Sequence, residues 1–130
     1  MILIDTDVCI EILRGNSKVI KKRNDFNDVI GISFMSVGEL YYGAEKSKYR
    51  DENIILVEEF LLTADIIESD VEIMKKFGEI KSKLIVKNEI ISDADIIIGS
   101  TALVKCDKLI TGNLDHFKRI EDLRLENWIR

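Results

Sequence analysis

The sequence predicts a three-layer α/β/α sandwich built around a central, mostly parallel sheet. Short apolar runs alternate with longer amphipathic stretches, the pattern of buried parallel strands that helices cover on both faces. The chain has 130 residues and 46% hydrophobic side chains, enough for one core without disulfide staples. Because no proline, repeat or low-complexity segment marks a boundary, we expect residues 1–130 to form a single domain.

Five short runs rich in apolar and β-branched residues predict the strands. The first, Ile2–Ile4, is entirely apolar and stops at Asp5, as a fully buried strand does. The other runs are similarly short and lie between longer, more polar segments. The predicted strands are residues 2–4, 29–33, 65–68, 109–111 and 123–125.

Apolar residues recur at helical spacing between these strands. Gly15 followed by Asn16 closes the first such stretch, as glycine and asparagine commonly do at helix ends. The long stretch 69–87 places its apolar residues on one helical face. The predicted helices are residues 7–14, 17–26, 36–46, 51–64, 69–87 and 92–105, with a single helical turn at 114–117.

Charge and cysteine content exclude several classes of protein. The chain carries 19 basic and 24 acidic side chains, a net charge of −5, which disfavours a duplex-DNA binder held by phosphate contacts. A nuclease is not excluded, because acids that hold a metal present a positive ion to the phosphate. Cys9 and Cys106 are far apart and lack metal-ligand spacing, so neither a disulfide scaffold nor a zinc ribbon is expected.

No segment predicts a membrane span or an export signal. The longest apolar run, around residues 96–98, is far shorter than the ~18 residues that cross a bilayer. The first residues lack the basic region of a signal peptide and soon reach an acid at Asp5. We therefore expect a cytoplasmic protein without a membrane partner.

Acidic side chains flank the carboxyl ends of the predicted strands. In open parallel sheets the binding site forms at this edge, where the strand order reverses. Carboxylate oxygens are the ligands preferred by hard cations such as Mg²⁺ and Mn²⁺, which support phosphoryl displacement. The candidate residues are Asp5, Asp7, Glu39, Asp93, Asp95, Asn113 and Asp115.

Helix capping is the alternative explanation for these acids. Ser36 as an N-cap followed by Glu39 forms a capping box, and Ser92 followed by Asp95 is closely related. Asp7 is a suitable N-cap for its own helix, and Asp93 lies at a helix start, where the helix dipole favours an anion. Taken singly each acid is better explained as a cap, but four caps have no reason to share one rim of a sheet. The cluster therefore favours a metal site.

Five short motifs follow one another from end to end of the chain. They are residues 2–7, 32–43 with the core SVGELYYG, 91–99 (ISDADIIIG), 109–113 (LITGN) with Phe117, and 125–128 (LENW). In order and spacing they resemble the motifs of PIN-domain proteins, particularly the toxin ribonucleases called VapC.

The resemblance implies a PIN-like fold and a Mg²⁺- or Mn²⁺-dependent endoribonuclease, the toxin of a type II toxin–antitoxin pair. Its products would carry 5′-phosphate and 3′-hydroxyl ends. It would be a homodimer, silenced by a small antitoxin of the VapB type whose tail lies across the active site. Asp5, Glu39 and Asp95 match the family's metal-holding acids. Independently of the resemblance, we expect Thr6, Ser36 and Asn113 either to orient the carboxylates or a water molecule or to serve as caps and turn formers.

Three positions depart from the family pattern. Asp7 stands where the family mostly has Asn or Ser and adds a carboxylate. Asn113 replaces the fourth Asp of many PIN domains, with Asp115 two residues further on. Gly99-Ser100 replaces the more usual Ala-Ala on the packed side of its helix, which we interpret as a packing detail.

Two other functions remain open at this point. The start of the chain also resembles the first motif of haloacid-dehalogenase-type phosphatases, with Asp5 as nucleophile and Asp7 as acid/base. The chain is short for that family and lacks its lysine and paired-aspartate motif. The other alternative is a catalytically silent PIN-like module that binds only RNA or a partner, an alternative that Asn113 keeps open.

Several remaining side chains have simpler expected roles. His116, the only histidine, is expected on the surface or in a helical turn, because the sequence identifies no partner for it. Trp128 and Phe117 are expected in the core or at a dimer edge. Apolar residues on the helices where the resemblance places antitoxin docking would fill the core unless they form an exposed patch. They are Leu40, Tyr41, Tyr42, Val57, Phe60 and Leu61.

Overall fold

A five-stranded sheet lies at the centre of the computed structural model, which describes residues 1–130. The strands stand in the order β3-β2-β1-β4-β5, and every neighbouring pair is parallel. Their bounds are β1 (Ile2–Ile4), β2 (Ile30–Ser33), β3 (Asp65–Ile67), β4 (Leu109–Ile110) and β5 (Leu125–Glu126). The predicted α/β class with a parallel sheet is therefore confirmed.

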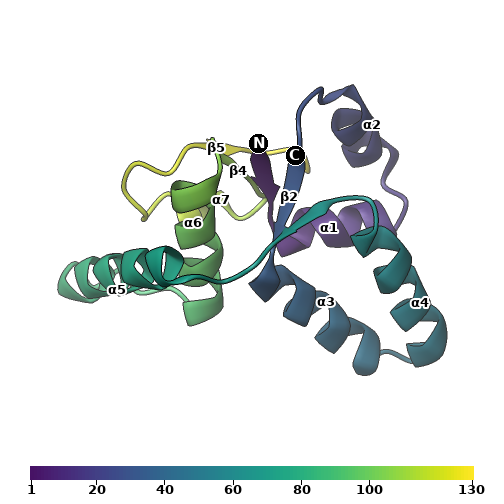
Figure 1. Cartoon of the computed structure of the whole chain (residues 1–130), viewed down its shortest axis with the longest axis horizontal. Helices are drawn as coiled ribbons and strands as arrows, with labels where there is room; N and C mark the ends of the chain where they lie inside the picture. The colour runs from purple at the N-terminus through teal and green to yellow at the C-terminus, as the bar shows by residue number, and fades with distance from the viewer.

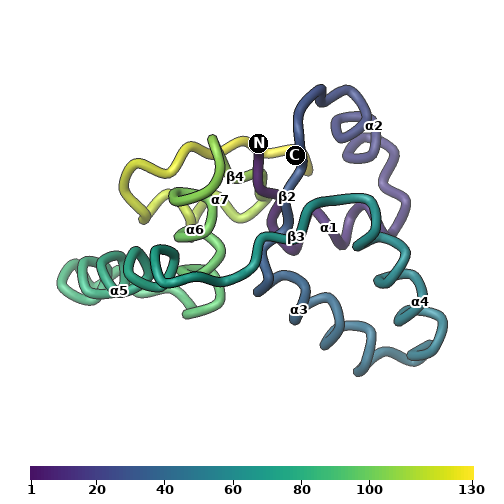
Figure 2. Tube along the Cα trace, viewed as in Figure 1, coloured from purple at the N-terminus to yellow at the C-terminus, as the bar shows by residue number.

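Helices cover both faces of this sheet (Figure 1). One layer contains α1 (Thr6–Leu13), α2 (Ser17–Asp25), α3 (Phe34–Glu45) and α4 (Arg50–Leu61). The other contains α5 (Val71–Val86), α6 (Asp93–Lys105) and α7 (Leu114–Phe117). The chain passes from the first layer to the second through β3, which links α4 to α5 (Figure 2). None of these helices combines the length and apolar character that crossing a membrane requires.

The first strand divides the core into two halves. Ile2 and Ile4 pack into the cluster formed with the first helical layer, whereas Leu3 packs into the cluster formed with the second. All three side chains are buried, as the period-two alternation of a strand with both faces covered requires. β1 is thus the centre of the sheet and of the hydrophobic core.

Two predicted helix starts are wrong. Ser36 does not cap its helix, because β2 turns directly into α3 at Ser33, whose hydroxyl accepts the N–H of Met35 at 3.1 Å. Ser36 lies inside α3 and is buried, so the predicted capping box with Glu39 does not form. Asp7 likewise lies inside α1, whose N-cap is Asp5. In both cases the strand passes into its helix with almost no loop, so the helix begins earlier than expected.

The strand order reverses beside β1. β2 and β3 extend the sheet on one side of β1, while β4 and β5 extend it on the other. The backbone N–H of Asp5, just beyond β1, donates to the carbonyl of Ile110 in β4 at 2.8 Å. Connections leaving the two neighbouring strands diverge at such a point and open a crevice beyond their carboxyl ends.

Gly99 lets the last turns of the chain pack against α6. A Cβ placed on Gly99 would lie 2.5 Å from Cδ1 of Ile120 and 3.8 Å from Cδ1 of Phe117. Both of these side chains are buried. Gly99 therefore allows Ile120, which follows α7, to pack closely against α6.

Replacing Gly99 with alanine is expected to destabilise the fold by about 1–3 kcal/mol, because an added methyl group overpacks the contact with Ile120. The free energy of unfolding in urea measures this change. Gly78→Ala is the matched control, since Gly78 lies in a helix where an added Cβ meets nothing within 4 Å. The control is expected to gain up to about 1 kcal/mol from helix propensity. A Gly99→Ala protein as stable as the control would contradict the packing argument.

Candidate active site

Asp5 is a buried carboxylate held from two directions. It follows β1 with extended backbone and serves as the N-cap of α1, so Oδ1 accepts the N–H of Thr6 at 2.7 Å. Oδ2 accepts the hydroxyl of Thr111, which follows β4, at 2.7 Å. Both Asp5 and Thr111 are buried, with 5% and 0% of their surface exposed. This hydrogen bond joins the carboxyl ends of β1 and β4.

Asp7 lies in the first turn of α1, beside the chain that leaves β4. Its Oδ2 accepts the N–H of Gly112 at 2.9 Å. A Cβ on Gly112 would come within 2.9 Å of that oxygen, so the glycine permits the close approach. Oδ1 of Asp7 is buried and has no hydrogen-bond partner. An orphaned carboxylate oxygen of this kind is costly unless something else satisfies it.

Glu39 reaches the same edge from α3. The hydroxyl of Thr6 contacts Oε1 of Glu39 at 2.7 Å and the hydroxyl of Ser36 at 2.8 Å. Because an ionised carboxylate only accepts, the single hydroxyl proton of Thr6 points at Glu39, and the hydroxyl of Ser36 donates to Thr6. The structure therefore brings Thr6 and Ser36 together with Glu39.

Asp95 enters from the first turn of α6. Its backbone N–H donates to the hydroxyl of Ser92 at 3.2 Å, so the predicted cap at Ser92 forms. Its Oδ2 lies 2.9 Å from Nδ1 of His116 in α7, and that nitrogen also lies 2.9 Å from the side-chain amide of Asn113. His116 thus has two polar partners where the sequence identified none.

A common pattern links Asp7, Glu39 and Asp95. Each has one carboxylate oxygen in contact with a polar group of the chain and a second oxygen with no hydrogen bond to the protein. A carboxylate fixed at one oxygen keeps the other available for an external ligand.

Burial and neighbouring negative charge raise the pKa of Asp5 to about 7. The neighbouring charges are those of Asp7 and Asp95, and the hydrogen bonds from Thr111 and Thr6 oppose the shift. Burial also raises the pKa of Asp7, while the N–H of Gly112 opposes this rise. The carboxylates are close enough to repel one another in a partly desolvated place.

This donor set fits a hard cation. The unpartnered oxygen of Asp7 and the raised pKa of Asp5 both mark negative charge that the protein itself leaves uncompensated. No three His, Cys, Asp or Glu side chains are grouped closely enough here to enclose a metal ion as they stand. Binding a cation would therefore have to draw the carboxylates together against their mutual repulsion.

Two predicted candidates lie outside this hydrogen-bonded network. Asp93 is exposed and pairs with Lys81 of α5 at 3.0 Å. Asp115 is exposed and pairs with Lys118 at 3.1 Å.

Sequence reasoning missed Thr111, Gly112 and His116 as members of the network. The only signals for them were positional: Thr111 ends the predicted strand 109–111, Gly112 follows it directly, and His116 lies in the predicted helical turn 114–117.

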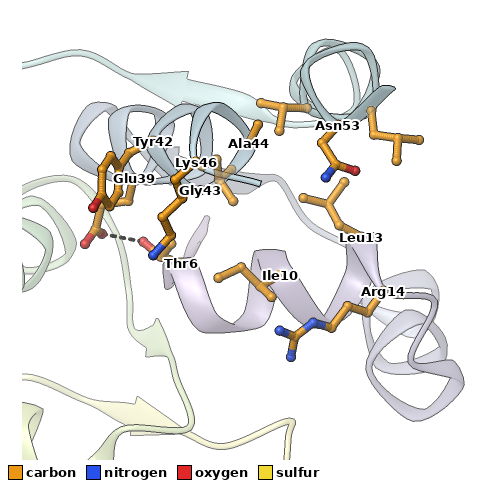
Figure 3. A pocket seen from close by; sticks show the side chains of 13 residues that line it. Thr6, Ile10, Leu13, Arg14, Glu39, Tyr42, Gly43, Ala44, Lys46 and Asn53 are labelled. Carbon is orange, nitrogen blue, oxygen red and sulfur yellow. Dashed lines mark hydrogen bonds between the residues drawn. The ribbon is translucent and has the colours of Figure 1, made fainter. Parts of the chain in front are cut away.

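An apolar groove of about 550 Å³ opens beside Thr6 and Glu39, between α1, α3 and α4 (Figure 3). Its wall includes exposed apolar side chains, among them Tyr42 with 66% and Leu56 with 46% of their surface exposed. Arg14 and Lys46 also line it, so two positive charges flank the apolar surface. Of the six apolar residues considered for docking, Leu40, Val57 and Phe60 are buried core residues and Tyr42 is the exposed one.

Comparison with known proteins places this chain in a family. Residues 2–123 match the PIN domain. Ribonuclease VapC2 from Haemophilus influenzae is 35% identical over 98% of this chain and 97% of its own length. The tRNA(fMet)-specific endonuclease VapC from Salmonella typhimurium is 30% identical over 97% of this chain and 96% of its own. The crystal structure of VapBC2 from Rickettsia felis, bound to a DNA fragment from their promoter, has a TM-score of 0.93 at 32% identity, covering 98% of this chain and 99% of that one.

The chain therefore belongs to the PIN domain family, whose nucleases are metal-dependent. Within it the chain belongs with the VapC ribonucleases, since relatives of that name match it at 30–35% identity over nearly its whole length. The phosphatase and the catalytically silent module are not favoured by these matches.

Replacing Asp5 with asparagine is expected to stabilise the metal-free protein near neutral pH. The folded-state pKa of Asp5 is raised from 3.8 to about 7, so stability attributable to this group is present at low pH and lost as pH rises through that interval. With EDTA present, the melting temperature of Asp5→Asn should exceed that of the unmodified chain at about pH 8. In a domain of this size, the melting temperature changes by roughly 4 °C for each 1 kcal/mol change in the free energy of unfolding.

The difference in melting temperature between Asp5→Asn and the unmodified chain should shrink toward about pH 5, where Asp5 itself is neutral. Asp115→Asn is the control, because the Asp115 side chain is 84% exposed and should show no such pH-dependent gain. An equal rise in the melting temperature of Asp5→Asn at both pH values would show that the rise does not come from removing the buried charge of Asp5.

Proposed function

We propose that this chain is an RNA-cleaving toxin of a toxin–antitoxin pair and that Asp5, Glu39 and Asp95 hold its Mg²⁺ or Mn²⁺. The observation that carries the proposal is a pair of neighbouring acids, the buried Asp5 with its raised pKa and the partly buried Asp7 with an unpartnered oxygen. Exposed helix caps would show neither feature. An all-oxygen donor set favours these hard cations over zinc or copper.

A bound divalent cation supplies positive charge at the scissile phosphate and lowers the pKa of a water ligand. The residues of the chain hold its ligands in place. Thr111 and the N–H of Thr6 orient Asp5, and the Thr6 hydroxyl orients Glu39. Asp7 adds a carboxylate where the family mostly has a neutral side chain. Its charge would favour a tightly bound cation.

The proposed substrate is RNA, and a tRNA is the first kind to test. The Salmonella relative is named for cleavage of tRNA(fMet), and the relatives from Haemophilus and Rickettsia are named ribonucleases. The proposed location is the cytoplasm, where such substrates occur.

The proposed partners are a second copy of the chain and a small antitoxin. Structures similar to this chain are complexes of VapC with VapB. The groove between α1, α3 and α4 suits an apolar antitoxin segment that ends beside Glu39. Arg14 and Lys46 would pair with acidic residues of that segment.

Cleavage of RNA by the antitoxin-free protein is expected to require a divalent metal and Asp95. Purified protein is incubated with a tRNA pool containing initiator tRNA and with a messenger RNA, with Mn²⁺, with Mg²⁺ and with EDTA. Discrete products with 5′-phosphate ends should form with metal and disappear in EDTA. Asp95→Asn should lower the rate more than about 100-fold, beyond the typical cost of losing a residue that only orients a ligand.

Asp115→Asn is the matched control and should cut at the normal rate, because Asp115 is exposed and paired with Lys118. Hydrolysis of small phosphate monoesters without any RNA cleavage would overturn the proposal in favour of a phosphatase.

A charge placed in the groove should separate inhibition from catalysis. Leu56→Glu is expected to keep metal-dependent cleavage and to weaken binding of the proposed VapB-type antitoxin at least tenfold, or about 1.4 kcal/mol. Titration of the antitoxin against RNA cleavage measures this change. Leu62→Glu is the control, since Leu62 is 87% exposed at the end of α4 and does not line the groove. Normal inhibition of Leu56→Glu would show that the antitoxin binds elsewhere.

A further inference from the structure

The single histidine of the chain lies between two polar groups of the candidate site. Nδ1 of His116 is 2.9 Å from Oδ2 of Asp95 and 2.9 Å from the side-chain amide nitrogen of Asn113. The Asp95 side chain is only 19% exposed, so this contact is partly shielded from water. One imidazole nitrogen therefore has two polar partners, and its protonation state must suit both.

The chemistry of the three groups selects one hydrogen-bond pattern. An ionised Asp95 can only accept, so Nδ1 of His116 must carry the proton. A protonated Nδ1 has no lone pair to offer, so the Asn113 atom that faces it must be the amide oxygen. Exchanging the nitrogen and oxygen of an amide moves no other atom, and the Asn113 side chain has no other hydrogen bond to lose. The Nδ1–H group then donates to Asp95 and Asn113 together.

These contacts continue to Asp5. The backbone N–H of Asn113 donates to the Thr111 hydroxyl at 3.0 Å, and that hydroxyl donates to Asp5 at 2.7 Å. An unbroken path therefore runs from Asp5 through Thr111, Asn113 and His116 to Asp95. It connects the acid after β1 with the acid at the start of α6, which lie 90 positions apart in the sequence.

The path rests on a rigid support. His116 lies in α7, whose next residue, Phe117, is fully buried against α6. Gly99 of α6 leaves room for Ile120, three residues further along, to pack against the same helix. The histidine and the aspartate it contacts therefore come from two helices that are fixed to one another, and rotation of the imidazole is limited by contacts at Nδ1.

We infer that His116 is a positioning residue, which through its Nδ1–H group fixes the Asp95 carboxylate relative to Asp5 and so sets the spacing of the proposed cation ligands. The inference rests on the proposed function, because it concerns the placement of Asp95. The hydrogen bond itself requires neither RNA nor catalysis, so it can be tested separately.

The first test is the tautomer of His116 in metal-free protein without a histidine tag. Since the chain has one histidine, a ¹⁵N-labelled sample gives one set of imidazole signals. At a pH where the ring is neutral, we expect the proton on Nδ1 in the unmodified chain and a shift toward Nε2–H in Asp95→Ala. A ring that carries its proton on Nε2 in the unmodified chain would overturn the inference.

The second test is the affinity for Mn²⁺ alone, measured by electron paramagnetic resonance without RNA. Asparagine places an amide nitrogen where histidine has Nδ1, glutamine places one nearer the position of Nε2, and phenylalanine keeps only the ring volume. We expect His116→Asn to bind Mn²⁺ within about threefold of the unmodified chain. His116→Gln and His116→Phe should bind about 10–100-fold more weakly, the usual cost of losing a group that orients a ligand.

The two tests separate failure of this inference from failure of the proposed function. Equal Mn²⁺ affinity in all four proteins, with RNA cleavage intact, would overturn the role of His116 alone. Absence of RNA cleavage together with the expected tautomer and affinity series would overturn the nuclease proposal and leave the positioning role supported. Melting temperatures confirm that each variant is folded. A folded His116→Asn protein that binds Mn²⁺ as weakly as His116→Phe would also count against the inference.

Discussion

The hydrogen bond from the buried Thr111 hydroxyl to Asp5 joins two neighbouring parallel strands at their carboxyl ends, and the candidate site is arranged around it. β1 and β4 are central strands, so both residues are held by the most buried part of the sheet. The same edge receives Glu39 from α3 and Asp95 from α6, because both helices begin there. A rigid sheet thus positions side chains that come from four separate segments.

The site gains its chemistry from an arrangement that opposes folding. Burial and neighbouring carboxylates disfavour the charged form of Asp5, and Asp7 keeps an oxygen without a partner. Hydrogen bonds from Thr111, Thr6 and Gly112 offset part of this cost. The remaining uncompensated charge is what would attract a cation, so the same feature that lowers the stability of the metal-free chain supports the proposed catalysis.

In this fold the same residues cap helices and build the candidate site. Asp5 caps α1 and is also the most buried acid of the site, while Ser92 caps α6 and holds the backbone of Asp95 in its first turn. The two explanations weighed for the acids are therefore compatible at these positions. They diverge at Ser36, which is no cap because α3 begins at Phe34, and which instead contacts the Thr6 hydroxyl. A strand that passes directly into a helix places capping residues at the edge of the sheet where the candidate site lies.

The sequence by itself determined the fold class, the approximate bounds of most elements and the acids that share one edge of the sheet, because these depend on local periodicity and on the strand-end rule. Only the tertiary structure decided which polar residues touch them. Thr111 meets Asp5, Gly112 meets Asp7 and His116 meets Asp95 across separations of 106, 105 and 21 positions. It also set Asp93 and Asp115 beside lysines. Such partners depend on the packing of helices and strands in three dimensions, which no spacing along the chain encodes.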